Sequence, residues 1–129
     1  MKKLFIIDDD SMYRMILQRI IARITSDLIV QEFKNGQEAI LELNKLITEG
    51  GLFPDIVLLD INMPVIDGWQ FLQKVTDMLA TVENNIAIYM VSTSLETRDK
   101  EMALGNKNVR AYLSKPVTMA SLKEIIEGR

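Results

Sequence analysis

The chain alternates between two patterns of hydrophobic and polar positions. The first is a short, nearly unbroken apolar run between polar or turn residues, and it occurs at 4–7, 28–33, 56–59, 86–91 and 109–113. Such runs are typical of strands that are buried on both faces of a parallel sheet. The second, with apolar residues every three or four positions, follows each run and is typical of a helix face. Strict strand–helix alternation predicts an α/β fold, a parallel sheet with helices on both faces.

Four of the helical segments carry an apolar stripe that we expect to face the sheet. The other segment, from about 95 to 104, is polar over much of its surface and is ended by Gly105. Ser11 is expected to cap the first helix, with its own oxygen or that of a neighbouring Asp accepting from free N–H groups. The expected buried stripes are Met12, Met15, Ile16, Ile20 and Ile24; Ala39, Ile40, Leu43, Leu46 and Ile47; Trp69, Leu72, Val75, Met78 and Leu79; and Met119, Leu122, Ile125 and Ile126.

The stretch from Pro54 to Pro64 organises the rest of the chain. Its apolar run, Ile56 to Leu59, ends on a carboxylate, Asp60. Ligands and chemistry gather at the carboxyl ends of the strands in a parallel sheet, so Asp60 is expected at the mouth of that crevice. Pro64 and the Asp67–Gly68 pair then predict a loop before the next helix.

The composition narrows the class of protein. A length of 129 residues fits one domain, and 48% apolar with 26% charged residues is ordinary for a soluble globular protein. A net charge of −3 without a Lys/Arg-rich run argues against nucleic acid as a partner. The N-terminal apolar run is too short for a signal peptide, and no run approaches the roughly 18 residues of a membrane span. We therefore expect a cytoplasmic protein that does not insert into membranes.

The chain contains no Cys and no His. Disulfides, thiolate metal sites and Cys nucleophiles are thereby excluded. The usual general base and the commonest transition-metal ligand are also missing. Any metal must be bound through oxygen, which favours Mg²⁺ or a similar hard cation.

Polar residues end or follow four of the predicted strands. The carboxyl ends of parallel strands share one edge of the sheet, so these side chains are expected to converge. Three neighbouring carboxylates repel one another and require a cation, and an oxygen-rich site favours Mg²⁺. A Lys and a hydroxyl beside them suit a phosphoryl group that a carboxylate attacks. The residues concerned are Asp8 and Asp9, Asp60, Ser92 and Thr93, and Lys115.

Each of these features also has a purely structural interpretation. The run Asp8-Asp9-Asp10 is a charge cluster that the dipole of the following helix would favour. Asp60 could simply end its strand and cap a turn, and Lys115 could be a surface residue before a Pro turn. The joint arrangement at four strand ends favours the functional interpretation.

Four segments together resemble the receiver domain of two-component response regulators, most closely the stand-alone, chemotaxis-regulator-like kind. The resemblance covers essentially all 129 residues, and the order and spacing of the segments make it specific. It implies a doubly wound, flavodoxin-like five-stranded sheet of order 2-1-3-4-5, flanked by five helices. The segments are Phe5 to Ser11, Asp60 to Gly68, Val91 to Ser94 and Ala111 to Pro116.

The resemblance also implies roles for the acidic residues. Asp60 would be the phosphoacceptor. Asp8 and Asp9 would hold Mg²⁺, Asp9 directly and Asp8 mostly through water. Asn62 would lend its backbone carbonyl to the metal, to which Asp60 would also bind.

Further roles implied by the resemblance concern binding and switching. Ser92 and Lys115 would bind the phosphoryl oxygens, and Tyr112 would be the aromatic switch residue of the last strand, coupled to Ser92. Two residues depart from the family's usual pattern. Thr93 stands where a small Ala or Gly is usual, and Val117 replaces a common Phe, which bears on the phosphorylation lifetime and the partner surface.

The function expected from these residues is a phosphorylation switch over 1–129 with no output domain. A histidine kinase or phosphotransfer protein would phosphorylate Asp60, and a downstream protein would read the altered surface. Beyond self-phosphorylation and slow self-dephosphorylation, we expect no enzyme activity, and we expect a monomer or weak dimer.

Two other functions compete with this one. A Mg²⁺-dependent phosphohydrolase of the haloacid-dehalogenase-like type also begins with an apolar strand and Asp-x-Asp, which would make Asp8 the nucleophile and Asp10 the acid. Such an enzyme needs a later acidic pair after a strand, and the only later strand-end acid is Asp60. A degenerate receiver used only for binding is disfavoured, because no member of the site is missing.

Overall fold

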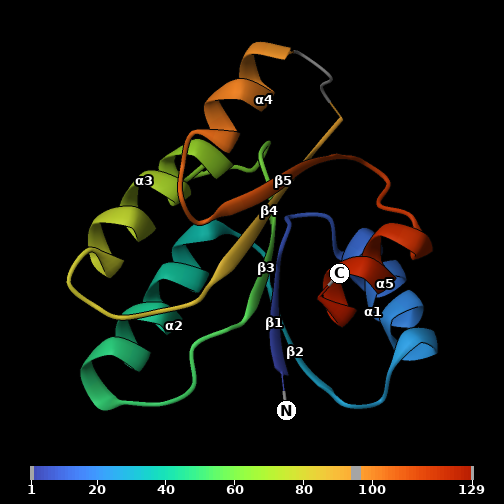
Figure 1. Ribbon diagram of the computed structural model, residues 1–129, viewed down its shortest axis with the longest axis horizontal. Coiled ribbons are helices and arrows are strands. Elements are labelled where there is room, and N and C mark those ends of the chain that lie inside the picture. The colour runs from blue at the N-terminus through green and yellow to red at the C-terminus, as the bar shows by residue number, and fades with distance from the viewer. Residues whose placement is uncertain (1, 94–96, 129) are drawn as a thin grey trace.

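A computed structural model describes the backbone of residues 2–93 and 97–128 and the side chains of 2–93 and 100–128. Within these residues strands and helices alternate along the chain, as Figure 1 shows. The strands are β1 (Lys2–Ile7), β2 (Leu28–Phe33), β3 (Ile56–Asp60), β4 (Ala87–Ser92) and β5 (Val109–Ser114). The helices are α1 (Ser11–Ile24), α2 (Gly36–Glu49), α3 (Gly68–Leu79), α4 (Thr97–Leu104) and α5 (Met119–Glu127).

The five strands form one parallel sheet in the order β2-β1-β3-β4-β5, which confirms the expected topology. Helices α1 and α5 cover one face of the sheet, and α2, α3 and α4 cover the other (Figure 1). The register pairs Ile7 of β1 with Leu59 of β3, and Asp60 of β3 with Val91 of β4. The carboxyl ends of the central strands therefore meet at one edge.

The two faces of the sheet have separate hydrophobic cores, because successive side chains of a strand point to opposite faces. In β3, Val57 and Leu59 pack with the α2 and α3 side, whereas Ile56 and Leu58 pack with the α1 and α5 side. All four are at most 4% exposed. A strand that is apolar at every position is stable only in such a doubly covered sheet.

The buried face of α1 differs from the expected one. Tyr13, Leu17 and Ile21 face the sheet, whereas Met12 and Met15 are 65% and 45% exposed. Ile16 is also exposed at 44%, and Ile20 and Ile24 are partly buried. The helix carries two adjacent apolar stripes, and periodicity alone does not decide which one is buried. The Tyr13 hydroxyl favours burial of the stripe that contains Tyr13, because it accepts a hydrogen bond from the backbone N–H of Val117 inside the fold.

The other predicted stripes are largely confirmed. Leu72, Val75 and Leu79 of α3 are buried, with Trp69 and Met78 partly buried. In α2, Ala39 and Leu43 are buried, and Ile40, Leu46 and Ile47 pack against the same core. In α5, Leu122, Ile125 and Ile126 are buried, but Met119 is 43% exposed. Of the segment expected at about 95–104, residues 95 and 96 lie outside the described residues.

No helix in the described part of the chain combines the length and the apolar character that crossing a membrane requires.

Candidate functional site

Two carboxylates lie side by side at the carboxyl edge of the sheet. In β1, Leu4 and Ile6 belong to the α1 and α5 core, so Asp8, two residues on, continues that face. Asp60 does the same after Ile56 and Leu58 in β3. Because Ile7 is paired with Leu59, the register puts Asp8 next to Asp60. Both are buried, with only 3% and 5% of their surface exposed.

Lys115 bridges the two carboxylates. Its Nζ lies 3.0 Å from Oδ2 of Asp8 and 3.8 Å from Oδ2 of Asp60. The backbone N–H of Lys115 donates to the carbonyl of Ser92 over 2.9 Å, which ties the end of β5 to the end of β4. The lysine is thus held at the site by its backbone and by its ammonium group.

The three acidic residues that follow β1 differ in their hydrogen bonds and in their exposure. Oδ1 of Asp8 accepts from the N–H of Asp10 over 2.9 Å, and the guanidinium of Arg14 donates to the carbonyl of Asp8. Asp9 is exposed. Asp10 is the N-cap of α1, where its Oδ1 accepts from Met12 N and Tyr13 N over 3.0 and 3.2 Å. The cap is therefore Asp10 and not Ser11, and Asp10 is turned to the helix and not to the other acids.

The loop after β3 holds Asp60 from the other side. The N–H of Asn62 lies 3.4 Å from Oδ1 of Asp60. The start of α3 comes very close, because a Cβ at Gly68 would lie 2.7 Å from Ile61 Cα and 2.9 Å from the Asp60 carbonyl oxygen. Only glycine allows this approach. Asp67 begins α3 with a capping box, in which its side chain and that of Gln70 are reciprocally bonded to backbone N–H groups.

Val65 marks a strained turn in the same loop. It has a φ of 68°, and the N–H of Ile66 donates to the carbonyl of Pro64 over 2.8 Å across it. This is a γ-turn of the rare positive-φ kind, which is costly for a β-branched residue. Val65 is 80% exposed.

The electrostatics of the site favour a cation. Burial and, next, the charge of Asp8 raise the pKa of Asp60 to about 6, against the opposing effect of Lys115. Burial alone would lower the pKa of Lys115, but its hydrogen bond to Asp8 and the charge of Asp60 outweigh burial and raise it. Lys115 therefore stays charged, and one ammonium does not fully compensate the buried carboxylates.

The donor set fits a hard divalent cation. One carboxylate oxygen from each of Asp8, Asp9 and Asp60 can be chosen so that all three lie within 4.8 Å of one another. These donors are all oxygens, the ligands that Mg²⁺ prefers. The exposed position of Asp9 leaves that side of the cluster open to solvent.

The remaining predicted residues lie around this cluster in different ways. Ser92 ends β4 and is 1% exposed, and Thr93 follows it on the surface. Asn62 is exposed in the loop after Asp60. Tyr112 is half-buried and packs against the α2 and α3 core, on the face of the sheet away from Lys115.

Sequence reasoning missed Arg14, which donates to the Asp8 carbonyl, and also Tyr13. Its ring lies beneath the Lys115 ammonium, with the Nζ 4.4 Å from the ring centroid. The available signal was a polar-tipped aromatic four residues after Asp9, but the α1 stripe was assigned to Met12 and Met15.

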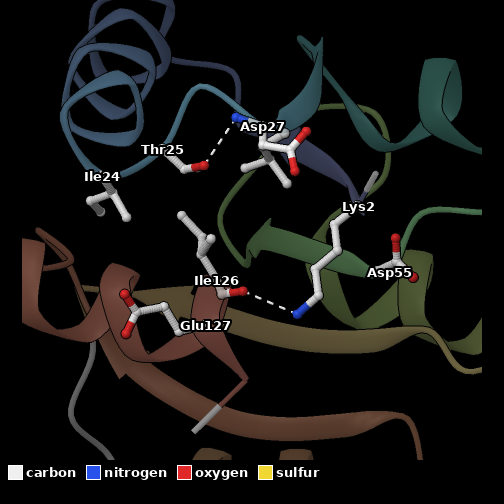
Figure 2. A pocket seen from close by; sticks show the side chains of 8 residues that line it. Lys2, Ile24, Thr25, Asp27, Asp55, Ile126 and Glu127 are labelled. Atoms are coloured by element: carbon white, nitrogen blue, oxygen red, sulfur yellow. Dashed lines mark hydrogen bonds between the residues drawn. The ribbon is translucent and has the colours of Figure 1, made fainter.

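A cavity of about 540 Å³ lies at the opposite, amino-terminal edge of the sheet (Figure 2). There Lys2 extends from β1 and its Nζ donates to the carbonyl of Ile126 over 3.1 Å, which ties the end of α5 to the sheet. Asp27, Asp55 and Glu127 also line the cavity. No residue of the acidic cluster contributes to it, so the cavity is separate from the candidate site.

Comparisons with known proteins agree with this geometry. A crystal structure of a two-component response regulator from Cytophaga hutchinsonii shares 30% identity with the chain, covering 98% of this chain and 95% of that one, with a TM-score of 0.88. The Vibrio cholerae chemotaxis protein CheY4 has the same fold, with a TM-score of 0.78 at 22% identity over 99% and 98% of the two chains.

Curated relatives differ in length. The probable methanogenesis regulatory protein FilR2 of Methanothrix harundinacea is 25% identical over 126 residues, which cover 96% of this chain and 78% of that protein. A protein-glutamate methylesterase/protein-glutamine glutaminase of Carboxydothermus hydrogenoformans is 40% identical over 72 residues, only 19% of its own length. The profile of the response regulator receiver domain matches residues 4–127. The chain therefore belongs to the response regulator receiver domain family, whose members are phosphorylation-dependent signalling switches.

Proposed function

We propose that Asp60 is the phosphoacceptor of this receiver and takes its phosphoryl group from a histidine kinase or phosphotransfer protein. The observation that carries the proposal is the position of Asp60 at the end of β3, where it is buried beside Asp8 and within 3.8 Å of the Lys115 ammonium that bridges the two carboxylates. A carboxylate held beside a fixed cation at an acidic, metal-competent edge suits nucleophilic attack on phosphorus.

The transfer is a single displacement. A carboxylate oxygen of Asp60 forms a bond to phosphorus while the bond from phosphorus to the donor breaks. The donor atom is the imidazole nitrogen of a phosphohistidine or the oxygen of acetyl phosphate, and it leaves with the bonding electron pair. Lys115 neutralises negative charge on the phosphoryl oxygens. The product is an acyl phosphate on Asp60.

The residues that would hold Mg²⁺ are Asp8, Asp9, Asp60 and the backbone carbonyl of Asn62. When bound, the ion would offset the charge of the carboxylates and of the incoming phosphoryl group. The Asp8 carboxylate is fixed in advance by the Asp10 N–H and the Lys115 ammonium, and Arg14 holds the Asp8 backbone carbonyl. Asp9 is free to adjust from the solvent side.

The signal would leave the site through Ser92 and Tyr112. A phosphoryl group brings about two negative charges and strong acceptors, and the Ser92 hydroxyl would turn toward it. Movement of the loop after β4 would change the space available to Tyr112, which would shift between outward and inward packing. A partner with acidic and apolar surface would read the change near the exposed Lys100, Lys107 and Arg110. The Arg98 side chain, expected on the same face, lies outside the described residues.

We further propose that residues 1–129 act as a receiver, a monomer or weak dimer whose own chemistry is limited to self-phosphorylation and slow self-dephosphorylation. A separate protein target, not a nucleic acid, would then read the phosphorylated surface.

The test is incubation with acetyl phosphate and Mg²⁺, followed by intact mass measurement. Wild-type protein should gain one phosphoryl group that is lost at high pH, and Asp60→Asn should gain none. A parallel assay for phosphate release from small phosphoesters separates the switch from a phosphohydrolase. Undiminished labelling of Asp60→Asn, or rapid turnover of phosphoesters that depends on Asp8, would contradict the proposal.

A further inference from the structure

Tyr13 connects the first helix to the lysine of the acidic site. Its ring belongs to the α1 and α5 core and the residue is only 9% exposed. The Lys115 Nζ lies 4.4 Å from the ring centroid, within the range of a cation–π contact. At the tip of the ring, the hydroxyl oxygen accepts from the N–H of Val117 over 3.0 Å. Tyr13 thus touches both the ammonium group of Lys115 and the backbone two residues beyond it.

The Lys115 ammonium has three neighbours in the site, and they differ in kind. Two of them, Asp8 and Asp60, are carboxylates. In the proposed reaction both would bind the cation, and Asp60 would also accept the phosphoryl group. The Tyr13 ring stays uncharged, because burial raises the pKa of its phenol above the usual value, although the Val117 N–H and Lys115 oppose this. It also cannot turn away, since its hydroxyl is bonded to Val117 and its edge is packed in the core.

We infer that Tyr13 is a positioning residue, whose ring face holds the Lys115 ammonium toward Asp60 when the carboxylates are engaged with the cation and the phosphoryl group. A lysine side chain has four rotatable carbons and a strongly hydrated head, so an ammonium without a fixed contact would spend much of its time in solvent. A desolvated aromatic face is one of the few neutral surfaces that attract it. The inference rests on the proposed role of Asp60, but it can be tested apart from that role.

Three variants distinguish the effect of losing the Tyr13 ring from the effects of losing its hydroxyl group or of weaker core packing. Tyr13→Phe keeps the ring face and loses the bond to Val117. Tyr13→Leu removes the ring face as well. Tyr89→Leu is the matched control, because Tyr89 packs against the same core from β4. Among the described residues, the cation–π contact of Lys115 is with the ring of Tyr13 and not with that of Tyr89. Urea unfolding of all three identifies effects that come only from lost stability.

The first measurement does not involve phosphorylation. Metal-free protein is treated with a small amine-acylating reagent, and the labelling rate of Lys115 is followed by peptide mass spectrometry relative to the exposed Lys34, whose side chain is 67% exposed. Tyr13→Leu should raise the relative rate by about fivefold, in keeping with the loss of a partly buried cation–π contact. Tyr13→Phe and Tyr89→Leu should stay within about twofold of wild type.

The second measurement is the rate of Asp60 phosphorylation by acetyl phosphate at saturating Mg²⁺. Tyr13→Leu should lower the maximal rate by about five- to tenfold, whereas Tyr13→Phe should stay near wild type. The inference is overturned if Tyr13→Leu leaves both the labelling of Lys115 and the maximal rate unchanged, or if Tyr13→Phe falls as far as Tyr13→Leu. If wild-type protein is not phosphorylated on Asp60, the proposed function fails, and the labelling comparison alone decides the role of Tyr13.

Discussion

Lys115 is closer to Asp8 than to Asp60. Its Nζ donates to Oδ2 of Asp8 over 3.0 Å, whereas Oδ2 of Asp60 lies 3.8 Å away. In this arrangement the ammonium compensates the charge of Asp8, a proposed metal ligand, more than that of Asp60, the proposed phosphoacceptor. Occupation of the acidic cluster by a cation would remove the need for that compensation and release Lys115 toward Asp60, where the phosphoryl oxygens would arrive in the proposed reaction.

The cation site predicts a strong dependence on Asp9. Asp9→Ala should weaken Mg²⁺ binding by about tenfold or more, because one of three charged oxygen ligands is lost. The half-buried Trp69, at the start of α3 after the Asp60 loop, provides a fluorescence signal for the titration. Asp10→Asn is the matched control, since Asp10 caps α1 and Asn is an equally good cap. Equal Mg²⁺ affinity in Asp9→Ala and wild type would refute the ligand assignment.

The raised pKa of Asp60 predicts how stability depends on pH without metal. Folding raises this pKa from 3.8 to about 6, so the folded protein binds more protons than the unfolded chain between those values. Stability must then fall as pH rises through this interval. Asp60→Asn lacks this loss, so its advantage in free energy of unfolding should grow from near zero at about pH 3 to about 3 kcal/mol at neutral pH.

Urea unfolding in the presence of a chelator measures this difference. The side chains that face Asp60, namely Asp8, Asp9 and Lys115, are the same in both proteins, so the two differ only in the carboxyl group at position 60. If the difference in free energy of unfolding between Asp60→Asn and the wild-type protein is the same at all pH values, burial does not raise the pKa of Asp60.

The strained turn at Val65 predicts a stabilising substitution. Val65→Gly should raise the free energy of unfolding by about 1 kcal/mol. The substitution removes the backbone strain of a β-branched residue at positive φ, and this gain exceeds the conformational entropy that glycine adds to the unfolded chain. Little packing is lost, since Val65 is 80% exposed. Val65→Ala keeps a Cβ at the same φ and should therefore gain less stability than Val65→Gly. A loss of stability in Val65→Gly would mean that the Val65 side chain makes a contribution beyond this turn.

Several features of this protein could be predicted from the sequence because they depend on neighbours along one strand. The run Ile56 to Leu59 is apolar at every position, and only a doubly covered strand needs that pattern. Once the strands are parallel, Asp8 and Asp60 must meet at one edge, so their convergence follows from the topology.

Other features depend on contacts between distant segments and were beyond sequence reasoning. The α1 helix offers two adjacent apolar stripes, and the choice of Tyr13 over Met12 is made by Val117 and Lys115 more than 100 residues away. The preference of Lys115 for Asp8 over Asp60 is likewise a matter of tertiary geometry. Ser11 and Asp10 are both good caps, and only the path of the loop selects Asp10.

The proposed switch predicts a coupling between Ser92 and Tyr112. With 3-fluorotyrosine at its three Tyr positions, the protein should give fluorine resonances in which Tyr112 shifts on addition of beryllofluoride, a stand-in for the phosphoryl group, and Mg²⁺. Tyr89, in the other core, is the internal reference. Ser92→Ala should still bind beryllofluoride but leave the Tyr112 resonance in place. An unshifted Tyr112 in the wild-type protein would disprove the coupling while leaving the chemistry at Asp60 open.

The central claim is that Asp60 carries the phosphoryl group, and borohydride trapping tests it most directly. Acyl phosphates are reduced by borohydride, which converts a phosphorylated Asp to homoserine at that position. After treatment with acetyl phosphate and Mg²⁺, tandem mass spectrometry should find homoserine at residue 60 of the wild-type protein and at no other Asp. Homoserine at position 8, or none at position 60 in protein that has gained a phosphoryl group, would contradict the account.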